Sequence, residues 1–373
     1  MTRRIFAILH HAIAILPKTM LGNPNTVSPE KVVRSIPEAW FDLSVRKHVV
    51  GMKIMRPAGI ETYAFPETLP PAFRTQMHFA QRHVYHLRDL SVNVKTGSCV
   101  AGSSYFQESY GSLRRCLLEK PFPVSRGHLV NNNKPITCVH AACYYHFLLE
   151  ELPRLLWTLH YHPNVTVMVH HSAPLYVMQA LDVLNNLGHE FNIVATVDDA
   201  VYLSNYVFTQ AEAYSGFVHT ADLMILRKHL LKYSTTTGAE RIYITRRKAT
   251  RCFDNEANIV SFMRESGFQI YSLEELDFET QINIFQKAKV VVAAHGAGLS
   301  NISWCNAGTR VIEIFSPRYF NDCYARICSQ LQLLYKPVWA QATQGWGRVS
   351  PEELSLALTG SVTEPSPTLP GKQ

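Results

Sequence analysis

The spacing of apolar and polar residues predicts strands that alternate with helices along most of the chain. Apolar residues at helical spacing indicate amphipathic helices, and short runs rich in β-branched residues indicate buried strands. The expected helices are residues 143–162, 173–188, 222–233, 256–267, 278–288 and 324–334. The strands expected between them are residues 164–171, 191–197, 241–247, 268–273, 289–294 and 309–315. Such alternation is typical of α/β proteins whose parallel sheets carry helices on their faces.

The first third of the chain has a different pattern. Residues 47–110 favour strands separated by turns rich in Pro and Gly. Further along, the polar stretch STTTGAE at residues 234–240 separates two α/β halves. We therefore expect a lead-in at residues 1–40, one α/β domain at 41–233, a second at 234–342, and a partly disordered tail at 343–373. Two halves joined by a short polar hinge suggest a cleft between them.

Composition and charge narrow the class of protein. A chain of 373 residues with 47% apolar and 17% charged residues is globular and long enough for two full cores. The net charge of +7 is dispersed, without a dense block of Lys and Arg. This distribution argues against a nucleic-acid partner and suits a phosphorylated or otherwise acidic substrate.

The cysteines and the N-terminus bear on the cellular compartment. The eight cysteines include no Cys-x-x-Cys pair and no zinc spacing, so they are free thiols in a reducing compartment or disulfides of a lumenal protein. The start, MTRRIFAILHHAIAIL, allows a signal sequence or anchor, an interfacial helix, or an ordinary first helix. No apolar run reaches the length needed to cross a bilayer. We expect a cytoplasmic protein, peripheral at a membrane surface; a signal or anchor would instead place it in the Golgi or ER lumen.

A glycine-containing loop directly follows one of the expected strands. The strand KVVVAA ends at His295, and Gly296, Ala297 and Gly298 lead into helix-forming residues. Small residues let a backbone approach a ligand closely, and the free amides at a helix start attract anions. The loop therefore predicts a phosphate cradle; the alternative is a tight turn in which His295 is a core histidine with satisfied hydrogen bonds.

A second expected strand is followed by basic residues. Arg246, Arg247, Lys248 and Arg251 lie just beyond the strand RIYI. Ligands of open α/β sheets bind outside the carboxyl ends of the strands, where arginines can neutralise a diphosphate. The alternative is a solvated basic loop.

Acidic residues in apolar surroundings are further candidates. Glu313 lies in the apolar strand RVIEIF, where it could accept hydrogen bonds from ribose or form a structural ion pair. His146 and Glu150 lie four residues apart, and therefore on one face of an expected helix. They form a surface pair or supply an acid and a base.

Four of these stretches together resemble glycosyltransferase family 61. They are HFLLEELPRLL (146–156), YITRRKATRCFDNE (243–256), SLEELDFETQINIFQKAKVVVAAHGAGLSN (272–301) and GTRVIEIF (308–315). The family includes bacterial polysaccharide-biosynthesis proteins and eukaryotic β-linked xylosyl- and N-acetylglucosaminyltransferases. The chain departs from the family pattern at Ala294 and at Cys252-Phe253, and residues 1–95 carry no resemblance.

The resemblance implies a GT-B architecture, with two Rossmann-like domains facing across a cleft. The first domain would take the acceptor, a glycan, polysaccharide or glycoprotein, and the second a nucleotide sugar such as a UDP-sugar. The resemblance also implies inverting transfer without a metal, and the sequence contains no Asp-x-Asp motif. No cofactor is expected beyond the donor as co-substrate.

The resemblance also assigns residues to roles. Glu150 would deprotonate the acceptor hydroxyl, with His146 as the reserve candidate. The residues expected to bind the donor are Arg246, Arg247, Asn255, Glu256, His295, Gly296, Ala297, Gly298, Asn301 and Glu313. Two alternatives remain: a relative that binds nucleotide sugars without catalysis, and a dinucleotide-dependent oxidoreductase. No GxGxxG follows an early strand, which argues against the oxidoreductase.

Overall fold

The computed structural model describes residues 49–65, 69, 73–101, 104–106, 129–130, 134–141, 143–212, 216–231, 238–247 and 251–360. The expected lead-in, the last thirteen residues and most of the polar hinge lie outside these ranges. Within them, strands and helices alternate from residue 136 to residue 359 as the periodicity predicts, except that β11 is followed directly by two further strands, β12 (Ala200–Leu203) and β13 (Tyr206–Thr209).

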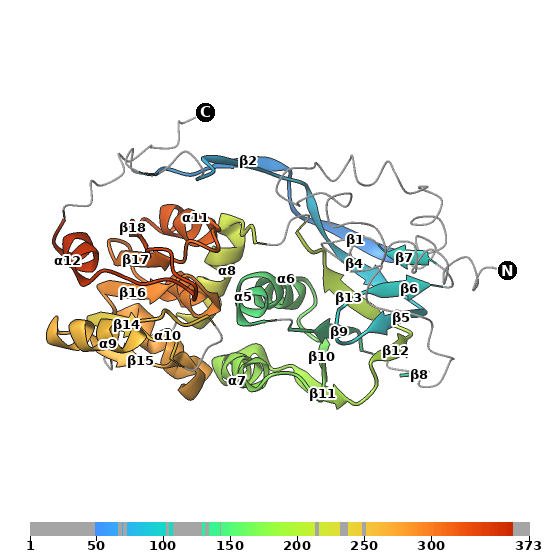
Figure 1. The fold of residues 1–373 in the computed structure, drawn as a ribbon. Helices are drawn as coiled ribbons and strands as arrows, with labels where there is room; N and C mark the ends of the chain where they lie inside the picture. The colour runs from blue at the N-terminus through green and yellow to red at the C-terminus, as the bar shows by residue number, and fades with distance from the viewer. Residues whose placement is uncertain are drawn as a thin grey trace.

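The C-terminal half is built on one parallel sheet of five strands (Figure 1). Its strands are β14 (Arg241–Ile244), β15 (Gln269–Tyr271), β16 (Val290–Ala294), β17 (Arg310–Phe315) and β18 (Leu334–Trp339). The order across the sheet is β15-β14-β16-β17-β18, and every neighbouring pair is parallel. The helical segments between and after the strands are α9 (Glu256–Glu265), η5 (Leu273–Glu275), α10 (Phe278–Lys287), the 3-10 helix η6 (Ala297–Trp304), α11 (Cys323–Gln330) and α12 (Pro351–Thr359).

Two elements of this half differ from the sequence-based expectation. The helix expected at 324–334 ends at Gln330, and Leu334 begins strand β18. The structure also continues beyond residue 342, where the tail was expected to begin. Helix α12 buries Leu354, and the side chain of Asn255 exchanges hydrogen bonds of 2.8 and 3.0 Å with the backbone of Val349. These contacts attach residues 343–359 to the sheet.

The N-terminal half contains a mixed sheet rather than a purely parallel one. The strand order is β1-β4-β13-β9-β10-β11, in which β9, β10, β11 and β13 are parallel while β4 runs antiparallel to both of its neighbours, β1 and β13. The strands are β1 (Val49–Arg56), β4 (Arg82–Leu87), β9 (Ile136–Val139), β10 (Thr166–His170), β11 (Asn192–Thr196) and β13 (Tyr206–Thr209). The helical segments that follow β9, β10 and β13 are α5 (Tyr144–His146), the π-helical turn η3 (Phe147–Glu151), α6 (Leu152–Tyr161), α7 (Leu175–Leu184), η4 (Asn185–His189) and α8 (Thr220–Leu230).

A second sheet covers one face of this mixed sheet. Its order is β7-β6-β5-β12-β8, and its strands are β5 (Leu90–Asn93), β6 (Cys99–Ala101), β7 (Ser104–Phe106), β8 (Leu129–Val130) and β12 (Ala200–Leu203). Leu90 and Val92 of β5 pack with Tyr85 and Phe208 in the core between the two sheets. Strands β5, β6 and β7 lie within the strand-rich residues 47–110, and β12 pairs directly with β5.

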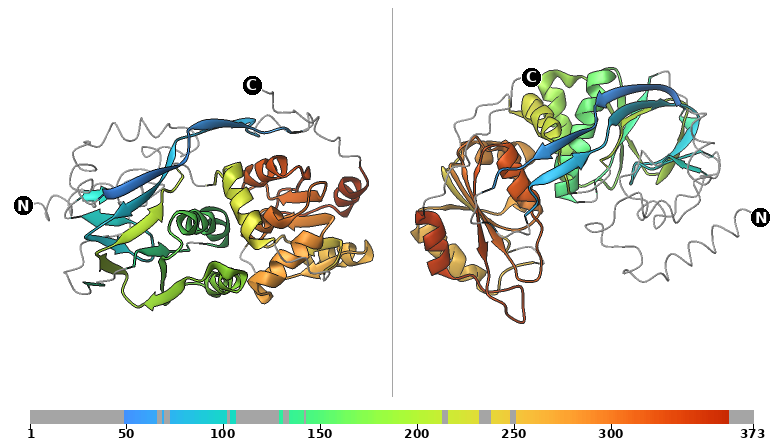
Figure 2. Two further views of the ribbon diagram at one scale, coloured as in Figure 1. Left: turned by 180° about the vertical axis from the view of Figure 1, so that it is seen from behind. Right: turned by 90° about the horizontal axis from the view of Figure 1, so that it is seen from above.

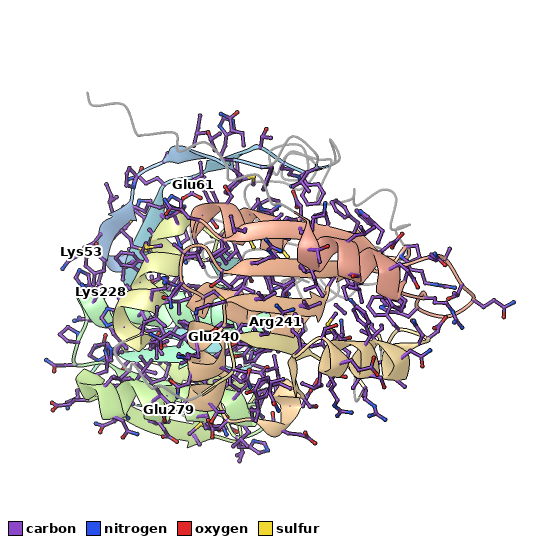
Figure 3. All side chains as sticks on the ribbon, turned by 90° about the vertical axis from the view of Figure 1, so that its left-hand side faces the viewer. Lys53, Glu61, Lys228, Glu240, Arg241 and Glu279 are labelled. Carbon is purple, nitrogen blue, oxygen red and sulfur yellow. The ribbon has the colours of Figure 1, made fainter. Side chains whose placement is uncertain are left out.

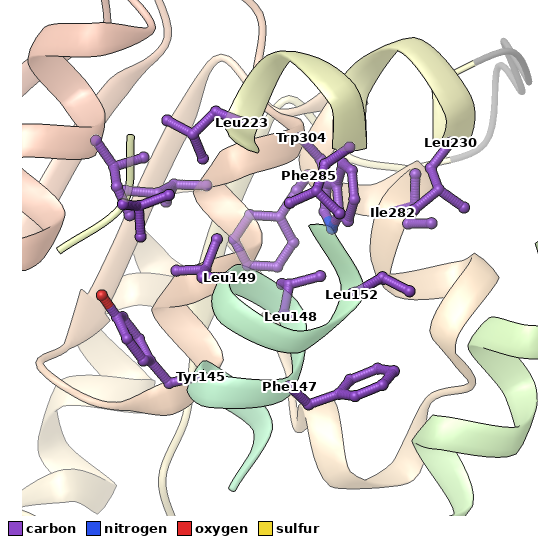
Figure 4. Close-up of a cluster of buried hydrophobic side chains, with 14 of the residues drawn as sticks. Tyr145, Phe147, Leu148, Leu149, Leu152, Leu223, Leu230, Ile282, Phe285 and Trp304 are labelled. Carbon is purple, nitrogen blue, oxygen red and sulfur yellow. The ribbon is translucent and has the colours of Figure 1, made fainter. Parts of the chain in front are cut away.

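The two halves share one hydrophobic core (Figure 4). We call this contact the apolar seam; it consists of Leu148, Leu149 and Leu152 from the first half, Ile282, Phe285 and Trp304 from the second, and Leu223 and Leu230 from α8. Each of these side chains is at most 2% exposed. Over the described residues, the two halves therefore pack against each other through this seam.

A hairpin from the first half also reaches over the second (Figures 1 and 2). It is formed by β2 (Gly59–Thr62) and β3 (Gln76–Phe79), which pair antiparallel. The amide of Ala64 donates to Ser329 Oγ at 2.8 Å, and the amide of Arg74 donates to Asp322 Oδ2 at 2.9 Å. Helix α11 is thus held near both of its ends. Among the described residues, no helix is both long and apolar enough to span a membrane.

Because the seam is shared, we predict that weakening it destabilises both halves together. Leu148→Ala removes a fully buried side chain and should lower the free energy of unfolding by about 2–5 kcal/mol. Leu356→Ala, at a position that is 70% exposed, is the matched control and should change it by less than about 0.5 kcal/mol. Chemical denaturation followed by fluorescence and circular dichroism measures both. Two separate transitions, of which Leu148→Ala shifts only one, would show independent domains.

Candidate active site

The loops after β14 and β16 meet at the point where the strand order of the C-terminal sheet reverses. Strand β15 lies outside β14, whereas β17 and β18 lie on the far side of β16. In chain order the sheet reads 2-1-3-4-5, whose switch point lies between its first and third strands, here β14 and β16. Arg246 follows β14 and His295 follows β16. The two motifs chosen from the sequence therefore lie side by side where ligands of such sheets bind.

Arg246 and Gly296 are in close contact. Arg246 Nη1 donates to the carbonyl oxygen of His295 at 2.6 Å, and a Cβ built on Gly296 would lie 2.2 Å from the same nitrogen. The backbone of Gly296 is extended, so glycine is required here by the arginine and not by strain. Gly298 is also confined, since a Cβ there would lie 2.9 Å from Leu273 Cδ1.

The arginines at this edge lack acidic partners. Across the described residues, no carboxylate lies within salt-bridge distance of Arg246, Arg247 or Arg251. Burial lowers the pKa of Arg246 because it disfavours the charged form. The neighbouring Arg251 guanidinium lowers it further because like charges repel. Arg251 lies over the rings of Tyr319 at 5.3 Å and Trp346 at 5.7 Å, while Arg247 is exposed. An anion bound here would relieve the uncompensated charge. Lys248 lies outside the described residues.

His295 is held by a buried carboxylate. Its Nδ1 forms a short hydrogen bond with Glu313 Oε1, and the hydroxyl of Tyr335 donates to Glu313 Oε2 at 2.5 Å. Glu313 is 0% exposed, so it cannot reach a ribose in this structure. In this structure the carboxylate is engaged by His295 and Tyr335, which corresponds to the structural alternative that the sequence left open.

Three other residues expected to bind the donor form hydrogen bonds within the protein in this structure. Asn301 is fully buried, and its side chain bonds Tyr144, Gln281, Trp304 and the carbonyl of Gly298. Asn255 bonds the backbone of Val349 through both side-chain atoms. Glu256 Oε1 accepts hydrogen bonds from Tyr243, Thr245 and the amide of Arg246. Among these groups, Glu256 Oε2 is buried without a hydrogen-bond partner in the described structure.

Of the expected acid and base, Glu150 lies on the π-helical turn η3 and His146 ends the short helix α5 directly before it. His146 Nδ1 lies 2.9 Å from Glu150 Oε2, and Glu150 Oε1 accepts a hydrogen bond of 2.8 Å from the amide of Gly216. The turn η3 precedes Pro153, which has no amide hydrogen to donate, and the amide of Leu152 bonds five residues back to Phe147. Pro153 was expected to bend or punctuate the helix, and the structure has a π-helical turn directly before it, which carries Glu150.

Gly216 belongs to the segment after β13, the neighbour of β9. Strands β10 and β11 extend the sheet on the other side of β9, so β9 and β13 flank a second switch point. The start of the segment after β13 is tied down by Arg82, which donates to the carbonyl of Gln210 at 2.6 Å and to Glu212 at 3.2 Å. Glu150 and His146 thus lie beside the switch point of the N-terminal sheet, as Arg246 and His295 lie beside that of the C-terminal sheet.

Hydrogen bonds change the charge state of this pair. Burial alone would lower the pKa of His146, but its hydrogen bonds with Cys143 and Glu150 raise the pKa to about 10. Burial tends to raise the pKa of Cys143, and the bond to His146 lowers it overall. His146 is therefore an imidazolium at neutral pH. The sequence reasoning missed Cys143, which precedes His146 by three residues at the helix start and could have been found from that spacing.

The two switch points face each other. The hydroxyl of Tyr144 donates to Asn301 Oδ1 at 2.9 Å, and the ring of Tyr145 lies 5.9 Å from that of Tyr324. Arg326 of α11 donates to the carbonyl of Gly216 at 2.9 Å. Elements of both halves therefore meet around one polar region, between Glu150 on one side and His295 on the other.

The described residues form an α/β protein with arginines that have no carboxylate within salt-bridge distance at one switch point and an acid–base pair at the other. Residues 144–312 match the family model described as Glycosyltransferase 61, and this match supports membership of that glycosyltransferase family. No curated protein matches the chain. The matched segment includes His146, Glu150, Arg246 and His295 and ends one residue before Glu313.

The raised pKa of His146 predicts a pH dependence of stability. The folded-state pKa of about 10 lies above the ordinary 6.5, so the contribution is complete below pH 6.5 and is lost as pH rises through 10. The free energy of unfolding of the wild type should therefore fall more between pH 6.5 and 10 than that of His146→Gln. Urea titrations across this range measure both proteins, with Glu150→Gln expected between them. Parallel curves for wild type and His146→Gln would contradict the prediction.

Proposed function

We propose that this glycosyltransferase is an inverting enzyme that uses a nucleotide-diphosphate sugar, specifically a UDP-sugar. The acceptor is a hydroxyl group of a glycan, polysaccharide or glycoprotein. The observation that carries the proposal is the partly buried Arg246, which has no acidic partner within salt-bridge distance among the described residues and lies against the glycine loop at a sheet switch point. A diphosphate is an anion of suitable size and charge for this position.

The proposed donor site lies in the C-terminal half. Arg246 and the start of η6, with Gly296, Ala297 and Gly298, hold the diphosphate, and the exposed Arg247 closes over it. Arg251, braced by Tyr319 and Trp346, adds charge at the same edge. These groups neutralise the leaving diphosphate without a metal. The sequence lacks Asp-x-Asp, and the described residues contain no group of three potential metal-ligating side chains.

The proposed acceptor site lies across from it, at Glu150. In an inverting transfer the acceptor oxygen attacks the anomeric carbon opposite the departing diphosphate, so its proton leaves on the far side. Because His146 is an imidazolium at neutral pH, Glu150 is the member of the pair with electron pairs available. The amide of Gly216 and His146 orient its carboxylate. In this proposal the two halves form a GT-B arrangement with the reaction between them.

We predict that donor binding depends on Arg246 and on the absence of a side chain at residue 296. A hydrogen bond to a charged group contributes about 1.5–3 kcal/mol, so Arg246→Gln should weaken UDP binding roughly 10- to 150-fold. Gly296→Ala should weaken it too, because the new Cβ displaces the guanidinium. Isothermal titration calorimetry with UDP measures the loss.

Two exposed sites provide matched controls for these variants. Arg264→Gln and Gly59→Ala, where a Cβ meets no atom within 4 Å, should bind UDP like the wild type. Binding and transfer should also persist in excess EDTA. Wild-type affinity in a folded Arg246→Gln protein would reject the donor site, and a loss in EDTA restored by metal would reject metal independence.

We further predict that Glu150 is the general base. Base assistance contributes about 10²- to 10⁴-fold in rate, so Glu150→Gln should keep UDP affinity but lose transfer by a factor in this range. The amide oxygen of the glutamine can still accept from Gly216, which preserves the backbone. Glu279→Gln, on the exposed face of α10, is the control and should transfer normally. Near-normal transfer by Glu150→Gln together with an inactive His146→Ala would assign the base to the histidine.

A further inference from the structure

Glu313 is a fully buried carboxylate, and one basic side chain, that of His295, lies beside it among the described residues. Its side chain is 0% exposed, and among the described residues His295 is its one salt-bridge partner. A buried carboxylate is costly unless a positive charge and hydrogen bonds compensate it. Tyr335 supplies a hydrogen bond but no charge. Among the described residues, His295 is therefore the one basic side chain placed to compensate this carboxylate.

The ring of His295 is fixed in place on several sides. It stacks on Phe315 at 5.4 Å with an interplanar angle of 23°, and the rings of Tyr319 and Tyr324 each lie 5.2 Å away. The hydroxyl of Tyr324 donates to the carbonyl of Gly296 at 2.6 Å, which ties this packing to the glycine loop. Since Nδ1 is bonded to Glu313, Nε2 is the ring nitrogen left for a ligand.

We infer that His295 is a catalytic residue that contacts the donor diphosphate through Nε2 as an imidazolium, and that Glu313 is the positioning residue that holds its ring and its charge. This inference rests on the proposed function and adds to it. The backbone amides and Arg246 bind the diphosphate in donor and product alike. The side chain of His295 additionally supplies a proton to the oxygen on which charge develops during the reaction.

The step forms one bond, breaks one bond and moves two protons. The acceptor oxygen forms a bond to the anomeric carbon, and the bond between that carbon and the diphosphate oxygen breaks with its electron pair on the oxygen. The proton on Nε2 of His295 passes to this oxygen, and the acceptor proton passes to Glu150. Solvent restores both groups after the products leave.

The surrounding charges favour this state only when an anion is bound. Glu313 faces the ring from β17, Tyr319 and Tyr324 face it from the loop before α11 and from α11, and Arg246 lies against its backbone from the loop after β14. Arg246 opposes a second positive charge, whereas Glu313 favours one. A neutral His295 donating through Nδ1 would turn the lone pair of Nε2 toward the phosphate oxygens, an unfavourable contact. Anion binding and protonation of His295 are therefore coupled.

The first test observes the protonation of His295 directly. Nitrogen-15 NMR of the protein labelled at histidine, assigned with His295→Gln, should show both ring nitrogens protonated in the UDP complex at neutral pH. UDP affinity should fall as pH rises. An unprotonated Nε2 in the saturated complex would overturn the inference while leaving donor binding intact. Failure of the wild type to bind UDP would overturn the proposed function, and the inference with it.

The second test removes the charge of Glu313 without changing its size. Glu313→Gln should weaken UDP binding roughly 10- to 150-fold, lower kcat, and abolish the pH dependence of affinity. Tyr335→Phe keeps the carboxylate and should have a smaller effect in the same direction. Glu240→Gln is the control, because Glu240 precedes β14 at the amino ends of the strands (Figure 3). Unchanged UDP affinity and pH dependence in a folded Glu313→Gln protein would assign Glu313 a purely structural role and overturn the inference.

Discussion

The apolar seam places the two switch points opposite each other. Leu148, Leu149 and Leu152 face Phe285 and Trp304 across it, on elements that also carry polar residues on their other sides. Glu150 lies between two seam leucines, and the loop at His295 continues directly into η6, which supplies Trp304. Packing on one face of η3 and η6 therefore determines the distance and direction between the acid–base pair and the donor loop. An α/β sheet alone would not bring these groups together.

This constraint explains several local irregularities. The π-helical turn η3 adds one residue to a helical turn and lets the leucines reach the seam while His146 and Glu150 stay together on the opposite side. The side chain of Asn301 forms hydrogen bonds with Trp304 in its own half and with Tyr144 in the other half. The hairpin β2–β3 and Arg326 hold α11 from the first half. Polar residues that the sequence offers as ligand contacts therefore form hydrogen bonds that hold the elements of the site together.

Much of the candidate site could be predicted because strand ends are local features. A run of β-branched residues predicts its strand, and the residue after it must lie at the carboxyl edge of a parallel sheet. Arg246, His295 and Gly296 were found in this way. Gly296 illustrates the limit: the sequence predicted close approach of a backbone to a ligand, and the structure shows close approach to the Arg246 guanidinium. The residue type was constrained as expected, but by a different neighbour.

The sequence by itself determined the alternation of strands and helices, the strand-rich start, and the edge of the sheet where the chemistry lies. It could do so because backbone geometry imposes repeat lengths on side chains that are neighbours along the chain. The partners of buried polar side chains were decided only by tertiary structure: Glu313 with His295 and Tyr335, Asn255 with Val349, and Glu150 with Gly216. The last of these pairs joins residues 66 positions apart, and Asn255 and Val349 are separated by 94. A buried polar atom forms its hydrogen bond with whichever group packs beside it, and that packing depends on all the segments that meet there.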